Sequence, residues 1–332
     1  MTMNSVDSYY GGLKVLVTGG LGFIGSNLAR RLVELGANVL VVDSLQPNTG
    51  ANTANLKDIE DRLQIRIVDL RRCDEIADLL PGHNVIFNLA GTVSHIDSMT
   101  DPVADLGANV HAQIVLLEAC RRYVPEARIV FASTRQIYGR PSGCPVPESH
   151  PLRPVDVNGI NKMTAEAYHT LYHQVYGLQT VSLRLTNTFG PRMRIKDARQ
   201  TFLGIWFRHV VEDRVFEVWG GQQKRDLTFV DDAVDAFLAA GALSTTQNRV
   251  FNLGGSPPVT LTELAESLVA IAGRGGFEIK QFPPEHLRID IGDYFADDRL
   301  FRKVTGWAPK VSLQEGLART IAYYRNCLSA YV

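Results

Sequence analysis

Three glycines spaced three residues apart, Gly19, Gly22 and Gly25, separate an apolar run from an amphipathic stretch. A strand, a glycine turn and a helix N-terminus in this order bind a pyrophosphate, because backbone N–H groups and the positive end of the helix converge there. Gly19 permits the tight turn, Gly22 lets the backbone approach the phosphates, and Gly25 lets helix and strand pack closely. We therefore expect this loop, with Phe23 and Ile24, to hold a dinucleotide.

A carboxylate, Asp43, ends the next apolar run, 18 residues after Gly25. There it can accept hydrogen bonds from ribose hydroxyls and would repel a 2′-phosphate, which favours NAD over NADP. The alternative is a plain glycine turn with Asp43 capping a strand. Two further strand ends fit the same ligand, with residues that reach the adenine or leave space beside the cofactor: Asp69, Leu70, Leu89, Ala90 and Gly91.

Further motifs appear in the order found in one family. They are Asn88-Leu89-Ala90-Gly91, a Ser/Thr strand ending in Tyr138-Gly139, Arg184-x-x-Asn187-x-x-Gly190-Pro191-Arg192, Arg225-Asp226, Val230-x-Asp232, Asn252-Leu253-Gly254 and Gly306-Trp307-x-Pro309. On these motifs the chain resembles an extended short-chain dehydrogenase/reductase of the NAD-dependent nucleotide-sugar epimerase/dehydratase group (UDP-glucose 4-epimerase-like). The similarity covers almost the whole chain.

Members of that family carry a Tyr-x-x-x-Lys pair, whose lysine and oxidised nicotinamide lower the tyrosine pKa so that a phenolate can take a sugar proton. Here Lys162 is present, but Asn158 stands four residues before it. A carboxamide has no accessible proton-accepting state. The literal Tyr10-x-x-x-Lys14 lies before the first strand and is a coincidence of spacing.

Three interpretations follow from Asn158. In the first and favoured one, another group takes the proton: Lys162 with a depressed pKa, a water held by Asn158 and Thr134, or His95 or Asp156. In the second, the protein binds NAD and a sugar nucleotide without catalysis. In the third, the protein catalyses a different reaction, which depends less on a general base.

The resemblance gives roles to the other candidate catalytic residues. Thr134 aligns with the Ser/Thr that hydrogen-bonds the reacting sugar oxygen, although a strand-end threonine often bonds only backbone. Lys162 would also hold the nicotinamide ribose. His95 follows the cofactor strand and is expected to line the sugar pocket or to be an ordinary lone histidine.

The residues after Thr134 discriminate between reactions. Related 4,6-dehydratases carry Asp-Glu there, and decarboxylases keep the glutamate, whereas this chain has Arg135 and Gln136, which cannot shuttle a proton at neutral pH. The resemblance then implies a 4-epimerase that works through a 4-keto intermediate on a nucleotide-linked hexose, uronate or heptose. A nucleotide-sugar oxidoreductase, a dehydratase or decarboxylase, and a non-catalytic binding protein are the alternatives.

A nucleotide diphosphate sugar needs cations or amide donors for its phosphates, and arginine binds phosphate with two hydrogen bonds. Four residues occupy positions similar to those in the family, and we expect them to face the cleft between the two domains: Asn187, Arg192, Arg225 and Arg288. For each arginine a solvated surface role is the alternative. We expect no metal site.

The elements that position these residues read as an α/β fold. Apolar strands at 13–17, 38–42, 65–68, 85–88, 129–132 and 180–184 alternate with amphipathic helices, which indicates a Rossmann-type doubly wound parallel sheet. Asp101 and Pro102 begin a helix that reaches Arg122. We expect an NAD-binding domain over residues 1–186, with returning segments near 228–254. A smaller mixed α/β nucleotide-sugar domain follows over 187–332.

Composition supports a globular protein. Its 332 residues are 45% hydrophobic with a net charge of −1, and no apolar run approaches membrane-helix length, so neither nucleic acid nor membrane is an expected partner. The N-terminus lacks a signal-peptide pattern and the four cysteines are scattered, which favours a cytoplasmic location. The resemblance also implies a homodimer that pairs helices around 101–122 and 161–176.

Overall fold

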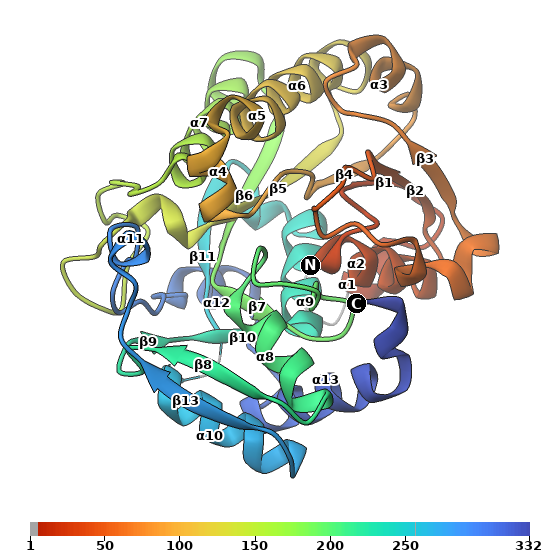
Figure 1. The fold of residues 1–332 in the computed structure, drawn as a ribbon. Coiled ribbons are helices and arrows are strands. Elements are labelled where there is room, and N and C mark those ends of the chain that lie inside the picture. Colours follow the sequence, from red (N-terminus) through yellow and green to blue (C-terminus); the bar gives the residue numbers. More distant parts are fainter. Residues whose placement is uncertain (1–5, 256) are drawn as a thin grey trace.

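The computed structural model describes residues 6–255 and 257–332 (Figure 1). Residues 1–5, which belong to the predicted N-terminal domain and to the N-terminus expected to lack a signal peptide, lie outside the described residues, as does Ser256 in the predicted second domain. Among the described helices, none is both long and apolar enough to cross a membrane.

A seven-stranded parallel sheet forms the centre of the molecule. Its order is β11-β6-β5-β4-β1-β2-β3. The strands are β1 (Lys14–Thr18), β2 (Asn38–Asp43), β3 (Gln64–Ile67), β4 (Val85–Asn88), β5 (Arg128–Thr134), β6 (Gln179–Leu185) and β11 (Arg249–Leu253). The predicted Rossmann-type sheet is confirmed, and the six predicted strand positions agree with the structure to within two residues at each end.

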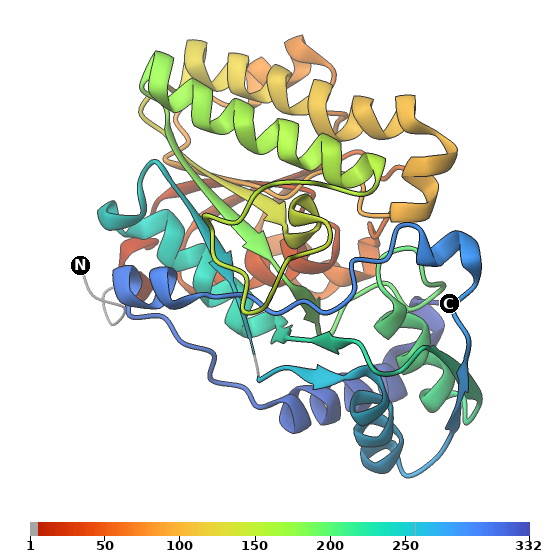
Figure 2. The ribbon, with the colours of Figure 1, turned by 90° about the vertical axis from the view of Figure 1, so that its left-hand side faces the viewer.

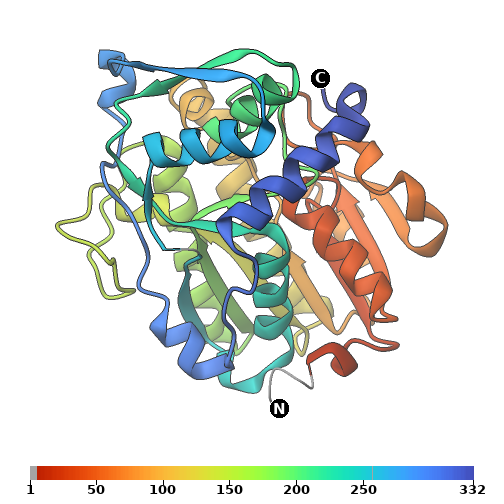
Figure 3. The same ribbon diagram turned by 90° about the horizontal axis from the view of Figure 1, so that it is seen from below.

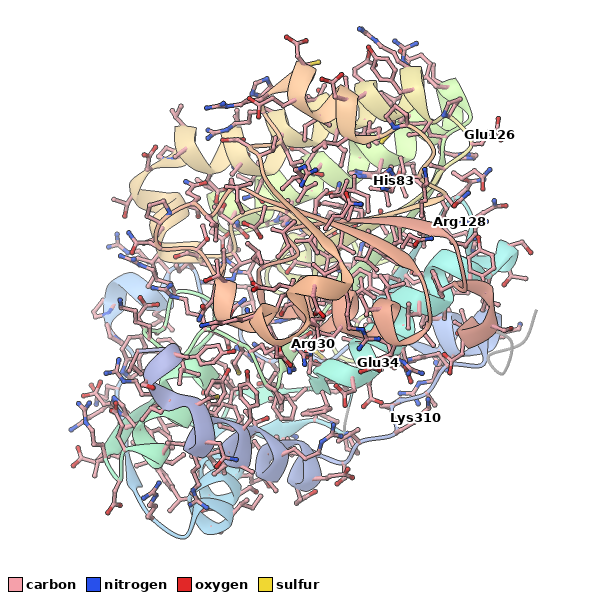
Figure 4. All side chains as sticks on the ribbon, turned by 90° about the vertical axis from the view of Figure 1, so that its right-hand side faces the viewer. Arg30, Glu34, His83, Glu126, Arg128 and Lys310 are labelled. Carbon is pink, nitrogen blue, oxygen red and sulfur yellow. The ribbon has the colours of Figure 1, made fainter. Side chains whose placement is uncertain are left out.

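Helices cover both faces of the sheet, as continuous apolar strands require. Figures 1 and 2 show one layer of α3 (Cys73–Leu79), α6 (Ala112–Tyr123) and α7 (Val157–Tyr176). The opposite layer consists of α1 (Val6–Tyr9), α2 (Phe23–Glu34), α9 (Val230–Ala242) and α12 (Arg299–Thr305). Because all strands are parallel, their carboxyl ends meet at a single edge. The strand starts, near His83, Glu126 and Arg128, lie at the opposite edge (Figure 4).

The helix predicted from Asp101 to Arg122 is interrupted. Asp101 caps it through a bond that its side chain accepts from the Ala104 N–H at 3.0 Å. The helix then runs through α5 (Pro102–Leu106), a π-helical segment η4 (Gly107–His111) and α6. This π segment faces α7, and π segments inside α-helices are frequent near functional sites.

The rest of the chain forms a smaller layered unit below the sheet (Figures 1 and 3). Its helices are α8 (Phe202–Val211), α10 (Leu261–Ala272), α11 (Pro284–Leu287) and α13 (Leu313–Cys327). Its strands pair as β8 (Val215–Trp219) with β13 (Gly276–Lys280), β9 (Lys224–Arg225) with β12 (Val259–Thr260), and β7 (Asn187–Phe189) with β10 (Leu227–Phe229). Short elements complete the chain: η2 (Thr53–Asn55), η3 (Lys57–Arg62), α4 (His95–Thr100), η5 (Arg135–Tyr138), η6 (Ser244–Thr246) and η7 (Leu328–Ala330).

The two units are interleaved rather than joined in series. β11 comes from the segment predicted to return near 228–254 and pairs in parallel with β6. The end of the chain also contacts the first unit: Asn52 donates to the Ala330 carbonyl at 2.8 Å, and the Tyr331 hydroxyl donates to Asn55 at 2.6 Å. The division at residue 186 itself stays a prediction.

Candidate active site

A cavity opens at the carboxyl edge of the sheet. It is lined by all twelve residues that the sequence suggested for the cofactor: Gly19, Gly22, Phe23, Ile24, Gly25, Asp43, Asp69, Leu70, Leu89, Ala90, Gly91 and Lys162. The candidate catalytic residues Thr134, Asn158 and His95 and the candidate substrate residue Asn187 line the same cavity. The carboxyl ends of strands β1, β2, β4, β5 and β6 therefore bring the predicted cofactor and catalytic residues together around one cavity.

The glycine loop has no room for side chains. Gly19 has a φ of +66°, and a Cβ there would lie 2.9 Å from the Leu89 carbonyl. A Cβ on Gly25 would lie 2.3 Å from the Gly19 oxygen. Gly22 occupies the N-cap position of α2 and makes no side-chain capping bond, so the first N–H groups of the helix are left for an anion. This cradle fits a pyrophosphate.

Asp43 is fixed at the end of β2. Its Oδ2 accepts from the Leu21 N–H at 3.1 Å, and its Oδ1 accepts from the Leu45 N–H at 3.0 Å. Burial raises the pKa of Asp43 above its usual value, while these backbone bonds oppose the rise. The carboxyl group lies where ribose hydroxyls would reach it. Asp69, by contrast, is already engaged with Arg71, whose side-chain hydrogen bonds lower the pKa of that carboxyl.

Lys162 is buried on α7. Its Nζ donates to the Ala132 carbonyl at 3.2 Å and lies 5.0 Å from the centre of the Phe131 ring. Burial lowers the pKa of Lys162 to about 8, although the nearby Asp105 acts in the opposite direction. An amine with this pKa is partly neutral near physiological pH.

Asn158 is held rigidly four residues before Lys162. Its Nδ2 donates to the Thr92 carbonyl at 2.9 Å and to Asp105 Oδ2 at 3.1 Å, and its backbone N–H donates to Ser98 Oγ at 3.2 Å. Both amide hydrogens are thus committed to the protein. The Oδ1 atom is left as the group that the side chain can offer to the cavity, and it can only accept a hydrogen bond.

Asp105 is a site residue that the sequence reasoning missed. It is 4% exposed and accepts hydrogen bonds from Thr92 Oγ1 at 2.7 Å and from Asn161 Nδ2 at 2.7 Å, in addition to the bond from Asn158. These partners lie 13 to 56 residues away along the chain, and no local motif connects them.

Two more polar side chains line the cavity from different elements. Thr134 ends β5, and its Oγ1 accepts from the Gln136 N–H at 3.2 Å, so its hydroxyl hydrogen is left to donate. His95 begins α4, and its Nδ1 lies 3.0 Å from Oδ2 of the buried Asp156. Gln136 donates to the same carboxylate oxygen at 2.7 Å.

The predicted substrate arginines do not line this cavity. Arg192 donates to Asn27 at 2.9 Å and lies over the Tyr323 ring, and Arg288 is exposed. Arg225 is buried, donates to the Gly292 carbonyl and pairs with Asp290 at 3.4 Å. Burial, with help from the neighbouring Arg135 cation, lowers the pKa of Arg225 to about 10.

Arg135 lines the cavity instead. Its guanidinium lies 5.3 Å from the centre of the Tyr294 ring, and its buried Nη1 has no hydrogen-bond partner among the described residues. The buried Asn187 Oδ1 is likewise unpartnered there. Buried polar atoms without partners are rare, and because Arg135 and Asn187 both line the cavity, a bound ligand could satisfy them. The sequence did not predict a ligand-binding role for Arg135.

Comparison with known proteins places these features in context. A profile of the NAD dependent epimerase/dehydratase family matches residues 15–254. The UDP-glucose 4-epimerase of Mycolicibacterium smegmatis is 32% identical over 318 residues, which are 95% of this chain and 99% of that protein.

Two solved structures extend the comparison. UDP-glucose 4-epimerase from Thermotoga maritima with UDP-glucose aligns with a TM-score of 0.86 and 29% identity, covering 95% of this chain and 100% of that one. A dTDP-glucose 4,6-dehydratase from Streptomyces venezuelae with NAD and TYD bound aligns with a TM-score of 0.87 and 26% identity, covering 96% and 99%. Similar folds therefore include both epimerases and dehydratases.

Proposed function

Because this chain belongs to the NAD dependent epimerase/dehydratase family, we propose that it inverts carbon 4 of a nucleotide-linked hexose, uronate or heptose through a 4-keto intermediate. The observation that carries this proposal is the convergence of the glycine loop, Thr134, Asn158 and Lys162 on one cavity. A cofactor that exchanges hydride and a set of groups that handle a hydroxyl proton are what reversible oxidation at one carbon needs.

The cofactor is NAD, which supplies the hydride acceptor and donor when it is bound. The uncapped N-terminus of α2 fits its pyrophosphate, and Asp43 fits its ribose hydroxyls. Lys162 would hold the second ribose from α7.

The protein side of the chemistry departs from the usual family pattern. Asn158 takes the position of the family's catalytic tyrosine and offers only a carbonyl oxygen, which orients a hydroxyl without taking its proton. Thr134 donates its hydroxyl hydrogen to the reacting oxygen. Arg135 is the cavity cation suited to the substrate's anionic part, and the NH₂ group of Asn187, not its Oδ1, could donate to it. Arg192, Arg225 and Arg288 would need side-chain movement to reach that part.

Elimination of water is disfavoured by the same cavity. Gln136 Nε2 is bound to Asp156, and Arg135 is a cation, so neither supplies the acid and base that a dehydratase places after this threonine. The presence of a dehydratase among similar structures makes this distinction worth measuring.

The test is a panel of UDP- and dTDP-linked hexoses, uronates and heptoses, incubated with the purified protein and followed by NMR. We expect a C4 epimer to appear without net accumulation of NADH, measured at 340 nm. Stoichiometric NADH would indicate an oxidoreductase, and a 4-keto-6-deoxy product would indicate a dehydratase. Binding of a nucleotide sugar without turnover would favour the non-catalytic alternative. Any of these three results would overturn the proposal.

A further inference from the structure

His95 and Asp156 form a pair that faces the cavity from two elements. His95 is the first residue of α4, and its side chain is 37% exposed, whereas the side chain of Asp156 is fully buried. The imidazole Nδ1 is itself buried and lies 3.0 Å from Asp156 Oδ2. The opposite edge of the ring, which carries Nε2, is therefore the edge that the cavity can reach.

Two hydrogen bonds hold the carboxylate of Asp156 in one orientation. Its Oδ1 accepts from the Gly159 N–H at 2.6 Å as the N-cap of α7, and its Oδ2 accepts from Gln136 Nε2 at 2.7 Å. Burial raises the pKa of this carboxyl, but the neighbouring His95 and the two donors outweigh burial and hold the pKa below its usual value. The group is thus an anion in the folded protein.

The alignment of the His95–Asp156 contact is imperfect. The distance suits a hydrogen bond, but the N–H direction does not meet the oxygen well. Catalytic hydrogen bonds are often poorly aligned before substrate binds and improve in the complex. A small rotation of the half-exposed ring would align this one.

We propose that His95, oriented by Asp156, is the group that accepts and returns the sugar hydroxyl proton in place of the missing tyrosine. Asp156 accepts the Nδ1 hydrogen, which leaves Nε2 unprotonated as the base. This is the logic by which a carboxylate fixes the tautomer of a catalytic histidine. The assignment rests on the proposed epimerase function.

The step balances within the cavity. The O–H bond of the C4 hydroxyl breaks, its proton binds Nε2 and the oxygen electrons form the carbonyl, while bound NAD would accept the C4 hydride. In the reverse half-reaction Nε2 returns the proton to oxygen, and the reduced cofactor would return the hydride to the other face. The other charged groups lining this cavity are Lys162 on α7, Arg135 on η5, and Asp43, Asp69 and Arg71 at strand ends.

The first test uses chemical rescue. His95→Gly should lower the epimerisation rate at least about 100-fold, in line with the usual contribution of a general base. The NAD content and the dissociation constant of the nucleotide sugar should stay close to those of the wild type. Added imidazole should raise the epimerisation rate of His95→Gly at least about tenfold, and the increase should level off at high imidazole concentration.

His83→Gln is the matched control, because His83 lies at the opposite edge of the sheet, where its Nδ1 contacts the Leu80 carbonyl (Figure 4). Its rate should equal that of the wild type and should not respond to imidazole. A wild-type rate in His95→Gly, or a lost rate that imidazole does not restore, would overturn the assignment.

The second test reads the tautomer without turnover. In long-range ¹H–¹⁵N spectra of the NAD-bound protein at pH 8.5, where an ordinary imidazole is neutral, His95 should carry its hydrogen on Nδ1. In Asp156→Asn, the Gly159 N–H retains the amide oxygen as its acceptor, and the Gln136 amide turns its oxygen toward the new NH₂ group. That NH₂ group then also faces Nδ1. The hydrogen should then move to Nε2 and the rate should fall. A wild-type His95 protonated on Nε2 would overturn the assignment.

The sugar panel and the His95 variant distinguish failure of the proposed function from failure of the His95 assignment. Absence of epimerisation by the wild type across the sugar panel would end the proposed function and this assignment together. Epimerisation that survives the loss of His95 would end the assignment alone.

Discussion

Asn158 and Asp105 act as a unit at the residue scale. A buried carboxylate that collects three hydrogen bonds, from Thr92, Asn158 and Asn161, fixes the amide in one orientation. The amide oxygen is then the atom of this side chain that is left for the cavity, as a neutral acceptor. The side chain of Asn158 therefore has a hydrogen-bond acceptor, and no free donor, to offer to the cavity.

Replacing Asp105 by Asn should destabilise the protein. A carboxamide oxygen cannot accept all three hydrogen bonds, and its NH₂ group would oppose one of the donors. Leaving a buried donor unpaired costs about 1–3 kcal/mol, which we expect as the loss in the free energy of unfolding measured in urea.

Asp101→Asn is the control for this experiment, since asparagine caps a helix about as well as aspartate. It should change the unfolding free energy by less than about 0.5 kcal/mol. Equal unfolding free energies for the Asp105 and Asp101 variants would show that the three hydrogen bonds to Asp105 do not stabilise the protein.

Lys162 makes stability depend on pH. Its pKa is about 8 in the folded protein against an ordinary value near 10.5, because burial disfavours the ammonium. Between these values the unfolded chain binds a proton that the folded protein does not, so stability should rise with pH from about 8 to about 10.5. Below pH 8 both states are protonated and this contribution stays at its minimum.

Lys162→Met should lose that rise and should also be inactive. Urea unfolding at pH 7.5, 8.5 and 9.5, without added nucleotide, measures the difference between the two proteins. A difference that stays constant across this range would mean that the lysine titrates normally.

The residues predicted for the cofactor line one cavity, and they could be named from the sequence because their information is local. Gly19, Gly22, Gly25 and Asp43 follow from spacing and strand ends alone. The direction of a long side chain is not local: Arg192 turns to Asn27, and Arg225 turns to the Gly292 carbonyl. Asp105 was missed for the same reason, since its partners are assembled by tertiary packing.

At the scale of elements, the β1–turn–α2 unit depends on contact between backbones. Gly25→Ala would place a methyl group 2.3 Å from the Gly19 carbonyl, so the loop must shift. We expect at least about tenfold weaker NAD binding by calorimetry and a lower melting temperature. Gly143→Ala, where nothing lies within 4 Å of the new methyl group, should bind NAD as the wild type does. Unchanged binding by the Gly25 variant would show that the loop accommodates the shift.

Strands and helix starts were predictable from the sequence where a single interaction determines them, such as apolar burial or side-chain capping. The buried strands follow from apolar runs, and the pattern Thr260-x-x-Glu263, which is typical of a capping box, forms one at the start of α10. Ser312 caps α13 by a single bond from the Glu315 N–H, while the Glu315 side chain lies 3.7 Å from Arg319. The π segment after Leu106 was not predicted, because it depends on packing against α7 and not on helix propensity.

At the scale of the whole molecule, an apolar face lies on the outer side of α5 and α7. Its exposed side chains are Val103, Leu106, Ile160, Leu171 and Val175. The last three recur along α7 at spacings that share one helix face. Exposed apolar stripes of this kind commonly mark interfaces between chains, which suits the predicted homodimer.

A double change, Leu171→Glu with Val175→Glu, should yield a monomer by light scattering coupled to gel filtration, because it buries charge in the interface. Ile279→Glu, an equally exposed apolar position on β13, is the control and should leave the dimer intact. A wild-type monomer at micromolar concentration would contradict the predicted dimer.

The place of β11 has a consequence for synthesis of the chain. Until residues 249–253 have been translated and have left the ribosome, β6 is an edge strand with unpaired backbone groups. The three glycines of the phosphate loop have by then long since left the ribosome. A fragment ending at residue 186 would keep that edge permanently and be prone to self-association. The central sheet is thus complete only after the chain has been translated well into the segment predicted to form the second domain.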